Sequence, residues 1–448
     1  MNWLVEPREA LRLWFKIGML SFGGPAGQIA LMHRTLVEER KWIGEERFLH
    51  ALNFCMLLPG PEAQQLATYI GWLIGGVRGG LAAGGLFVLP GAVVMLVLSI
   101  LYTSFADTSL LQGIMYGVKA AVVAIVIEAL LRIGRRALTG TLARVIAVSA
   151  FFAIYFLGAP FPLIVLGAGA IGALSSRFLK RSPLRSQSTS GKTDVAPLID
   201  AALDKGQLTH TRPNLPRALA IAAGGVAIWF SPVALSAALG GAVFTEIGFF
   251  FSKMAVVTFG GAYAVLAYVT AQAVEAHHWL TPAQMLHGLG LAETTPGPLI
   301  LVLQFVGFLA AHRQHGMLDP MIAGALGAAM TLWVTFVPSF LWIFVGAPYA
   351  EALRRVPALS AALAGITAAV VGVIANLTLW FGVHALFGTV VTWRGGLIRA
   401  DLPKLASLDP VAMALALFAA VTLLVLKWPL LRVLGACAVA GALLHLAS

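Results

Sequence analysis

Two short motifs near the start of the chain combine helix-breaking residues with polar neighbours. The first is SFGGP at Ser21–Pro25, and the second is LLPGPEAQQ at Leu57–Gln65. A glycine pair followed by proline interrupts helical hydrogen bonding, and proline is favourable where a new helix begins because its missing N–H is not needed there. The free N–H groups and the dipole of a helix start attract anions. We therefore expect both motifs to begin half-helices that can hold an anion.

Both motifs recur in the second half of the chain. TFGGA at Thr258–Ala262 matches the first motif, with Ala262 in place of Pro25, and TTPGP at Thr294–Pro298 matches the second. Two simpler interpretations stay open: the glycine pairs could serve close helix packing, and the ProGlyPro triplets could be ordinary loop turns.

The polar and helix-breaking residues around these motifs are the candidate anion ligands. Lys16 and Lys253 precede the glycine pairs in apolar segments, and Lys119 lies in a third such segment. An ionisable residue inside a membrane is costly and is a functional candidate, although lysines also extend toward the membrane surface. The candidate binding residues are Lys16, Ser21, Phe22, Gly23, Gly24, Gln28, Pro59, Gly60, Pro61, Glu62, Gln64, Lys119, Lys253, Thr258, Phe259, Gly260, Gly261, Glu293, Thr294, Thr295, Pro296, Gly297 and Pro298.

The expected chemistry divides among these side chains. The lysines would supply positive charge, and the glutamines and threonines would donate hydrogen bonds. Glu62 and Glu293 are the candidates for carrying a proton if a proton is coupled to anion binding. We expect no catalytic residue, no metal site and no cofactor, because no persuasive metal cluster, cysteine pair or nucleotide-binding loop is present.

The recurrence of the motifs reflects an internal duplication. Shifting the chain by 237 residues (259 − 22 = 237) aligns both pairs of motifs without a gap. The match continues beyond a gap, where GVKAAVVAIV from Gly117 resembles GITAAVVGVI from Gly365. We assign residues 1–176 to a first membrane repeat, 177–217 to a basic linker, 218–240 to a connecting transmembrane helix and 241–448 to a second membrane repeat.

Composition and charge indicate where these repeats lie. Of the 448 residues, 59% are hydrophobic and only 11% are charged, which excludes an ordinary soluble protein. The net charge of +11 fits cytoplasmic loops rather than nucleic-acid binding. The linker is polar and basic, so we expect it to be flexible and cytoplasmic. The single connecting helix would make the two repeats inverted, and inverted repeats with broken helices are typical of secondary transporters. The fold class is therefore an all-α polytopic membrane protein.

The motifs together resemble the chromate ion transporter family. The resemblance rests on SFGGP, LLPGPEAQQLATYIGW, TFGGA, LAETTPGPLILVLQFVGF and TFVPSF, and it covers nearly the whole chain outside the linker. The length resembles the family's long, two-repeat members. Family positions fall on Phe22, Gly23, Gly24, Pro25, Pro59, Gly60, Pro61, Gly71 and Pro90, and again on Phe259, Gly260, Gly261, Pro296, Gly297, Pro298, Gly307 and Pro338.

The resemblance implies an exporter of chromate, and of sulfate-like tetrahedral oxyanions, in the bacterial plasma membrane. We expect the membrane potential or the proton-motive force to drive it. A sulfate importer that uses cation symport, an anion channel and a membrane-embedded chromate reductase are the alternatives, and the absence of electron-transfer motifs disfavours the enzyme. The expected partners are chromate or sulfate and the lipid bilayer. A coupled proton or other ion and a homodimer stay open.

Overall fold

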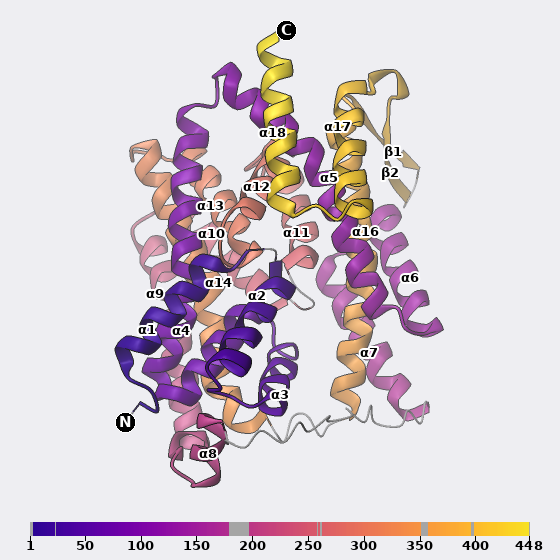
Figure 1. The fold of residues 1–448 in the computed structure, drawn as a ribbon. Coiled ribbons are helices and arrows are strands. Elements are labelled where there is room, and N and C mark those ends of the chain that lie inside the picture. The colour runs from indigo at the N-terminus through magenta and orange to yellow at the C-terminus, as the bar shows by residue number, and fades with distance from the viewer. Residues whose placement is uncertain are drawn as a thin grey trace.

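The computed structural model describes residues 3–22, 24–178, 197–257, 259, 262–350, 357–395 and 398–447. Nearly all of this part of the chain is helical, and most of the long helices run along the vertical direction of Figure 1. Among the described residues, five helices are long and apolar enough to cross a membrane: Glu62–Ser104, Ser109–Ala137, Leu215–Ala238, Pro320–Tyr349 and Ala361–Leu386. The prediction of an all-α polytopic membrane protein is confirmed.

The first repeat, the linker and the connecting helix contain the following elements: α1 (Pro7–Leu20), α2 (Gly24–His33), the π-helix η1 (Arg34–Glu39), α3 (Glu45–Cys55), α4 (Glu62–Ser104), α5 (Ser109–Ala137), α6 (Thr141–Leu157), α7 (Phe161–Phe178), α8 (Leu198–Asp204), the 3₁₀ turn η2 (Thr209–Thr211) and α9 (Leu215–Ala238). The helix α4 is bent where Gly75 and Gly76 leave the helical conformation, Gly76 with a φ of 62°. Only glycine readily combines this φ with the ψ of −151° found at Gly76, so the bend is fixed by the sequence.

The second repeat contains the following elements: α10 (Ala242–Val257), α11 (Ala262–Thr270), the π-helix η3 (Ala271–Ala276), α12 (Pro282–Thr294), η4 (Leu299–Leu301), α13 (Val302–Arg313), α14 (Pro320–Gly346), η5 (Ala347–Tyr349), α16 (Pro357–Leu386), β1 (Val390–Gly395), β2 (Ile398–Pro403), η6 (Leu405–Ser407), α17 (Pro410–Ala420), the π-helix η7 (Val421–Val425) and α18 (Leu430–Ala447).

The sequence duplication is also a duplication of backbone conformation. The π-helices η1 and η3 begin at Arg34 and Ala271, which are 237 residues apart (271 − 34 = 237). Each is followed by a non-glycine residue with φ of 52°, Lys41 in one repeat and His278 in the other. A π-helix and a left-handed residue are both rare, so their recurrence at the same spacing reflects a shared local fold.

The two repeats are interlocked through their last helices. The helix α18 of the second repeat packs on α5 of the first, and α7 of the first packs on α16 of the second (Figure 1). Equivalent glycines allow this close approach, because a Cβ atom at Gly117 would overlap the carbonyl oxygen of Cys437 and one at Gly365 would overlap that of Ala168. The inverted orientation of the repeats stays a prediction.

The second part of the linker is folded, contrary to the expectation of a flexible loop. The side chain of Ile199 is fully buried, and the carboxylate of Asp200 accepts hydrogen bonds from the Gly44 amide (2.8 Å) and the Arg47 guanidinium (2.8 Å). His210 lies 2.8 Å from the Trp72 carbonyl oxygen, just before the bend in α4. These contacts hold the segment in place. Its side chains bond to the Gly44 amide at the start of α3 and to the Trp72 carbonyl beside the bend, two groups that the helices themselves leave without partners. The first part of the linker, residues 179–196, lies outside the described residues.

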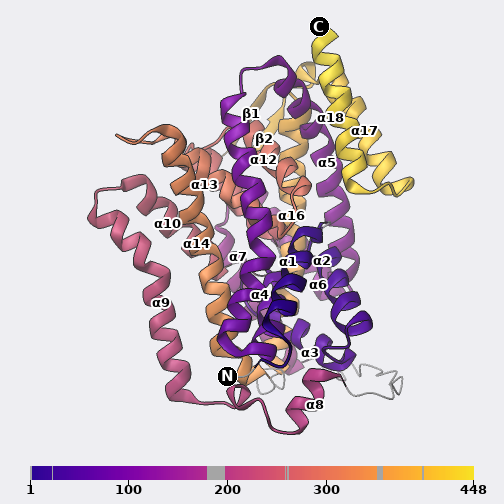
Figure 2. The same ribbon diagram turned by 60° about the vertical axis from the view of Figure 1, so that its left-hand side comes forward.

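A β-hairpin and an exposed helix complete the fold. The strands β1 and β2 pair antiparallel, with Val390 opposite Pro403, and the sequence interpretation did not predict them. Figure 2 shows α9 standing at the edge of the bundle, and Leu215, Leu219 and Leu235 on it are exposed. An apolar helix with an exposed apolar surface fits the predicted connecting transmembrane helix.

Candidate anion-binding site

Four helix starts meet at one point of the structure. They are the starts of α2, α4, α11 and the η4–α13 helix, and they border a cavity of about 20 Å³ that we call the junction cavity. Its lining residues are Pro25, Gln28, Gly60, Pro61, Glu62, Ala63, Ala262, Pro298, Leu299 and Ile300. The sequence motifs predicted each of these breaks separately, but only the fold brings the four together.

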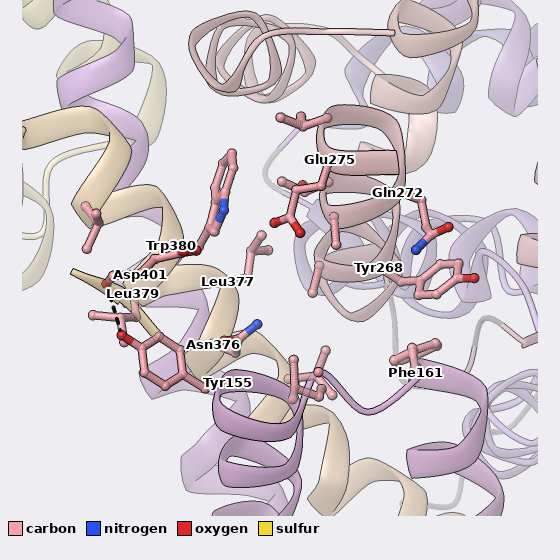
Figure 3. Close-up of a pocket in the computed structure, with 18 of the residues that line it drawn as sticks. Tyr155, Phe161, Tyr268, Gln272, Glu275, Asn376, Leu377, Leu379, Trp380 and Asp401 are labelled. Atoms are coloured by element: carbon pink, nitrogen blue, oxygen red, sulfur yellow. Dashed lines mark hydrogen bonds between the residues drawn. The ribbon is translucent and has the colours of Figure 1, made fainter. Parts of the chain in front are cut away.

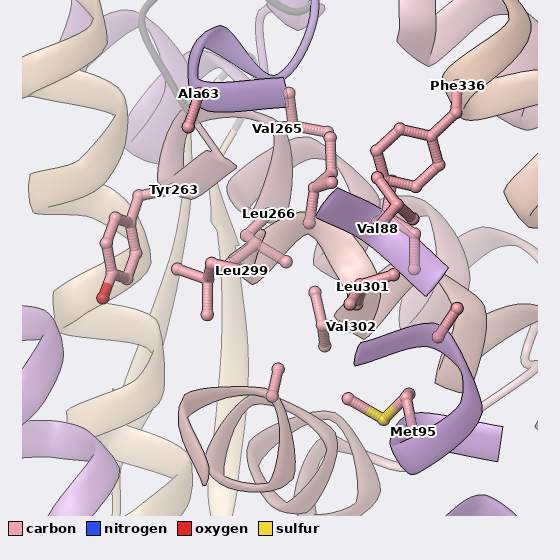
Figure 4. Packing of buried hydrophobic residues seen from close by; sticks show 14 of the residues in the cluster. Ala63, Val88, Met95, Tyr263, Val265, Leu266, Leu299, Leu301, Val302 and Phe336 are labelled. Atoms are coloured by element: carbon pink, nitrogen blue, oxygen red, sulfur yellow. The ribbon is translucent and has the colours of Figure 1, made fainter. Parts of the chain in front are cut away.

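The lining of the junction cavity is pseudo-symmetric. Pro61 and Pro298 occupy equivalent positions of the two repeats, as do Pro25 and Ala262, Ala63 and Ile300, and Glu62 and Leu299. Figure 4 shows part of the apolar shell in which this junction is embedded, with Ala63 and Leu299 in the same buried cluster. The cavity therefore lies between corresponding parts of the two repeats, where a transporter built from repeats places its substrate.

The helix starts can supply the positive potential that an anion needs. The helix α4 follows Pro61 and η4 follows Pro298, and neither start has a side-chain cap. Each helix start carries a partial positive charge, so four starts around one cavity favour an anion. The junction cavity as it stands has room for about one water molecule and none for a tetrahedral oxyanion. We call this arrangement, with its small cavity, the closed state.

A hydrogen-bonded latch joins the two repeats beside the cavity. The Gln28 side-chain amide donates to the carbonyl oxygens of Gly297 (2.6 Å) and Ser21 (3.4 Å), and the Gly297 amide donates to the same Ser21 oxygen (2.8 Å). We expected Gln28 to donate to the anion, but in this state its N–H groups are used by backbone carbonyls. The equivalent residue in the second repeat is Val265, which cannot form such a latch.

The other predicted hydrogen-bond donors are also engaged within the protein. The Gln64 amide donates to the Thr68 hydroxyl (3.0 Å). The hydroxyls of Thr294 and Thr295 donate to carbonyl oxygens of their own helix, those of Leu291 (2.7 Å) and Ala292 (2.8 Å). In the closed state these three residues stabilise the breaks rather than face the cavity.

The two glutamates that we considered as proton carriers have different surroundings. Glu62 lines the junction cavity, in the first turn of α4. Glu293 is buried, accepts a hydrogen bond from the Tyr263 hydroxyl (2.5 Å) and does not line the cavity. Of the two candidate proton carriers, the structure therefore places only Glu62 at the cavity.

The structure brings none of the three candidate lysines to the junction cavity. Lys16 is exposed on α1, and Lys253 is exposed on α10 with its amine 3.4 Å from the Tyr268 hydroxyl. Lys119 lies over the Tyr116 ring, 5.4 Å from its centroid, and the Tyr116 hydroxyl donates to Asp409. The expectation that these lysines supply charge beside the breaks is not met here. The physical reason is that the long apolar stem of a lysine lets its amine extend away from the helix toward a polar region, instead of staying beside the helix break.

The glycines and aromatic residues of the breaks have structural roles. Gly60 and Gly297 have φ of 123° and 89°, which only glycine adopts readily, so both ProGlyPro turns depend on them. Gly24 also has a positive φ of 72°, at the start of α2. Phe22 is partly exposed and Phe259 is packed against the core. Gly23, Thr258, Gly260 and Gly261 lie outside the described residues.

Comparison with known proteins decides the family. The sequence model of the family described as "Chromate transporter" matches residues 8–173 and 245–442, which is most of the chain. The chain belongs to the chromate transporter family.

Curated relatives of this chromate transporter family member carry similar names. The "Chromate transport protein" of Pseudomonas aeruginosa is 34% identical over 374 residues, 82% of this chain and 79% of the relative. The protein of that name from Cupriavidus metallidurans is 27% identical over 372 residues, 83% and 82% of the two chains. The "Probable chromate transport protein" of Synechococcus elongatus is 28% identical over 388 residues, 85% of each chain. No solved structure matches this chain.

A second, larger cleft of this family member lies away from the helix breaks. It measures about 640 Å³ and lies between the α6–α7 turn, η3, α16 and the β-hairpin (Figure 3). The carboxylates of Glu275 and Asp401 line it, and none of its described lining residues is lysine or arginine. None of the four helix starts borders this cleft, so its size alone does not make it the anion site.

Two residues that join α4 to the second repeat were missed by the sequence interpretation. Gly91 of α4 faces the Pro296 carbonyl oxygen so closely that a Cβ atom there would overlap it. The Gln304 amide of α13 donates to the Ala92 carbonyl oxygen (2.9 Å) and so joins the second repeat to α4. The only sequence signal for Gly91 is its position directly after Pro90, and Gln304 stands out as a polar residue in an apolar segment.

Proposed function

We propose that this protein exports chromate across the bacterial plasma membrane and binds it between the four helix starts of the junction cavity. The observation that carries this proposal is the convergence of α2, α4, α11 and η4 on one cavity lined by equivalent residues of both repeats. Backbone N–H groups of the first turns hold the tetrahedral oxyanion, and their dipoles balance its two negative charges. Sulfate has the same shape and charge, so the site takes sulfate-like oxyanions as well.

The closed junction cavity favours an alternating mechanism over an open channel. A cavity with room for about one water has to enlarge before the oxyanion enters it. The latch between Gln28, Gly297 and Ser21 is the contact that has to open on one side of the cavity. On this proposal the two repeats are inverted and the linker faces the cytoplasm. The side of the cavity that carries the latch and the opposite side of the cavity open to different sides of the membrane.

The membrane potential provides enough energy for export. One elementary charge across 100 mV corresponds to about 2.3 kcal/mol, so a dianion leaving a cell that is negative inside gains about 4.6 kcal/mol. Import of sulfate, the nearest alternative, has to overcome the same energy and requires co-transported cations.

The test is uptake of labelled chromate and labelled sulfate into everted membrane vesicles that contain the protein. We expect chromate to accumulate when the vesicle interior is made positive, and accumulation to vanish when the potential is collapsed. Vesicles without the protein are the control. Sulfate uptake without chromate uptake would keep the site and change the substrate, whereas flux of neither anion would contradict the proposal.

A further inference from the structure

One carboxylate is placed where the oxyanion has to bind. Glu62 is the single ionisable residue among the described residues that line the junction cavity. No hydrogen bond or ion pair joins its carboxylate to another residue in the described ranges. The second repeat has Leu299 at the equivalent position, so the two-fold arrangement of the cavity is broken at this one charge.

The elements around Glu62 offer little to neutralise it. The helix α3 packs on α4 and ends at the buried Cys55. The helix α11 contributes Tyr263, whose hydroxyl donates to Glu293, and α14 contains no ionisable residue. His33 lies at the far end of α2, where it bonds to Glu45 at a distance of 2.5 Å.

A dianion and an ionised carboxylate exclude each other from so small a space. Their repulsion is strong in a buried site because little water screens it. A protonated Glu62 has the opposite effect, since it is neutral and its O–H group can donate a hydrogen bond to an oxyanion oxygen. Occupation of the cavity by a dianion is therefore linked to the protonation of this residue.

We propose that Glu62 must carry a proton when the oxyanion occupies the junction cavity, so that each oxyanion crosses the membrane together with one proton. The proton enters from the side on which the anion binds, stays on the Glu62 carboxyl group and leaves as the anion is released. Two negative charges and one positive charge then move per cycle, which leaves one net charge, so the membrane potential supplies half the energy that it gives to the dianion alone. This inference rests on the proposed function and specifies its stoichiometry and the residue responsible.

The experiment uses the full-length protein reconstituted into liposomes, with labelled chromate outside and a pH indicator trapped inside. For the wild type we expect one proton to enter per chromate and one net charge to move. In Glu62→Gln the proton entry that accompanies chromate is lost and the charge moved per chromate doubles to two, because the amide stays neutral without a proton. The matched variant Glu293→Gln keeps the wild-type ratio, since Glu293 lies outside the cavity and an amide oxygen still accepts from Tyr263.

The outcomes separate the inference from the proposed function. If the wild type moves no chromate, the proposed function fails. If chromate moves and Glu62→Gln still takes up one proton per chromate, the inference fails, because the proton then travels on the substrate or on another residue. Should Glu62→Gln not fold, Glu62→Leu copies the residue of the second repeat and is subject to the same criterion. A folded variant that no longer binds chromate, measured as loss of the chromate-induced shift in melting temperature, also contradicts the inference.

Discussion

The side-chain amide nitrogen of Gln28 lies 2.6 Å from the carbonyl oxygen of Gly297, although 269 residues separate them in the chain. This hydrogen bond joins the glycine-pair break of the first repeat to the ProGlyPro break of the second. Because the Gly297 amide donates to the Ser21 carbonyl oxygen in return, the two breaks hold each other in place. The closed cavity is thus maintained by contacts that neither repeat makes alone.

Removing the latch should destabilise the closed state. We expect Gln28→Val, which copies Val265 of the second repeat, to lower the free energy of unfolding by about 1–3 kcal/mol, because the Gly297 carbonyl loses a buried partner. The melting temperature of the purified protein measures this effect. Thr378→Val removes a hydrogen bond within α16 and serves as the control, for which we expect a smaller change. Equal melting temperatures for Gln28→Val and the wild type would show that the latch does not hold the closed state.

The packing of Pro296 on α4 should tolerate no side chain at Gly91. A methyl group there overlaps the Pro296 carbonyl oxygen, so we expect Gly91→Ala to cost about 1–3 kcal/mol of stability and to lower chromate flux. Gly85→Ala lies on the same helix with no atom within 4 Å of the added Cβ. That control should keep its flux and gain about 0.5–1 kcal/mol. Similar stability and flux for the two variants would argue against the close approach at Gly91.

The exposed lysines should be dispensable for transport. Lys16 and Lys253 both lie outside the junction cavity, and we therefore expect the double variant Lys16→Ala/Lys253→Ala to keep chromate flux within about twofold of the wild type. The assay is uptake into everted vesicles, normalised to the amount of protein in the membrane. Loss of flux at normal protein levels would restore the role that the sequence interpretation gave to these residues.

The folded part of the linker should be held by Asp200. We expect Asp200→Asn to weaken the contacts with Gly44 and Arg47 by about 1.5–3 kcal/mol, because the hydrogen bonds involve a charged acceptor. Limited trypsin digestion at Lys205 measures the loosening of this segment as faster cleavage. Asp204→Asn, an exposed neighbour, should be cleaved at the wild-type rate. An unchanged rate for Asp200→Asn would mean that other contacts hold the segment.

The same segment should loosen in acid because of His210. Burial lowers the pKa of His210 below its usual 6.5, and the positive charge of Arg217 lowers it further, although the hydrogen bond to the Trp72 carbonyl opposes both effects. A lowered pKa means that the docked state prefers the neutral ring. The contribution of His210 is therefore present above pH 6.5 and decreases as the pH falls toward the lowered pKa. Trypsin should cleave the wild type faster, relative to a peptide substrate, as the pH is lowered from about 7.5 to about 5.5. His210→Phe should lose this pH dependence, and a wild-type rate that is constant with pH would contradict the assignment.

The local breaks could be predicted from the sequence because their causes are local. Proline lacks an N–H group and glycine permits a positive φ, so the helix starts near Pro61 and Pro298 follow from the residues themselves. The duplication could be predicted for a similar reason, since a shift of 237 residues repeats the same local conformations. The roles of Gln28 and of the lysines could not, because a side chain's partner depends on which distant segment packs against it.

The sequence by itself therefore determined the class of protein, the duplication, the polar linker and the positions of the helix breaks. Only the tertiary structure decided that the four breaks share one cavity, that Glu62 lines it while Glu293 bonds to Tyr263, and that the second half of the linker is folded. The physical reason is that helix propensity and apolarity depend on residues that are close together in the chain. The position of a charge relative to a cavity is fixed instead by packing between segments that are hundreds of residues apart.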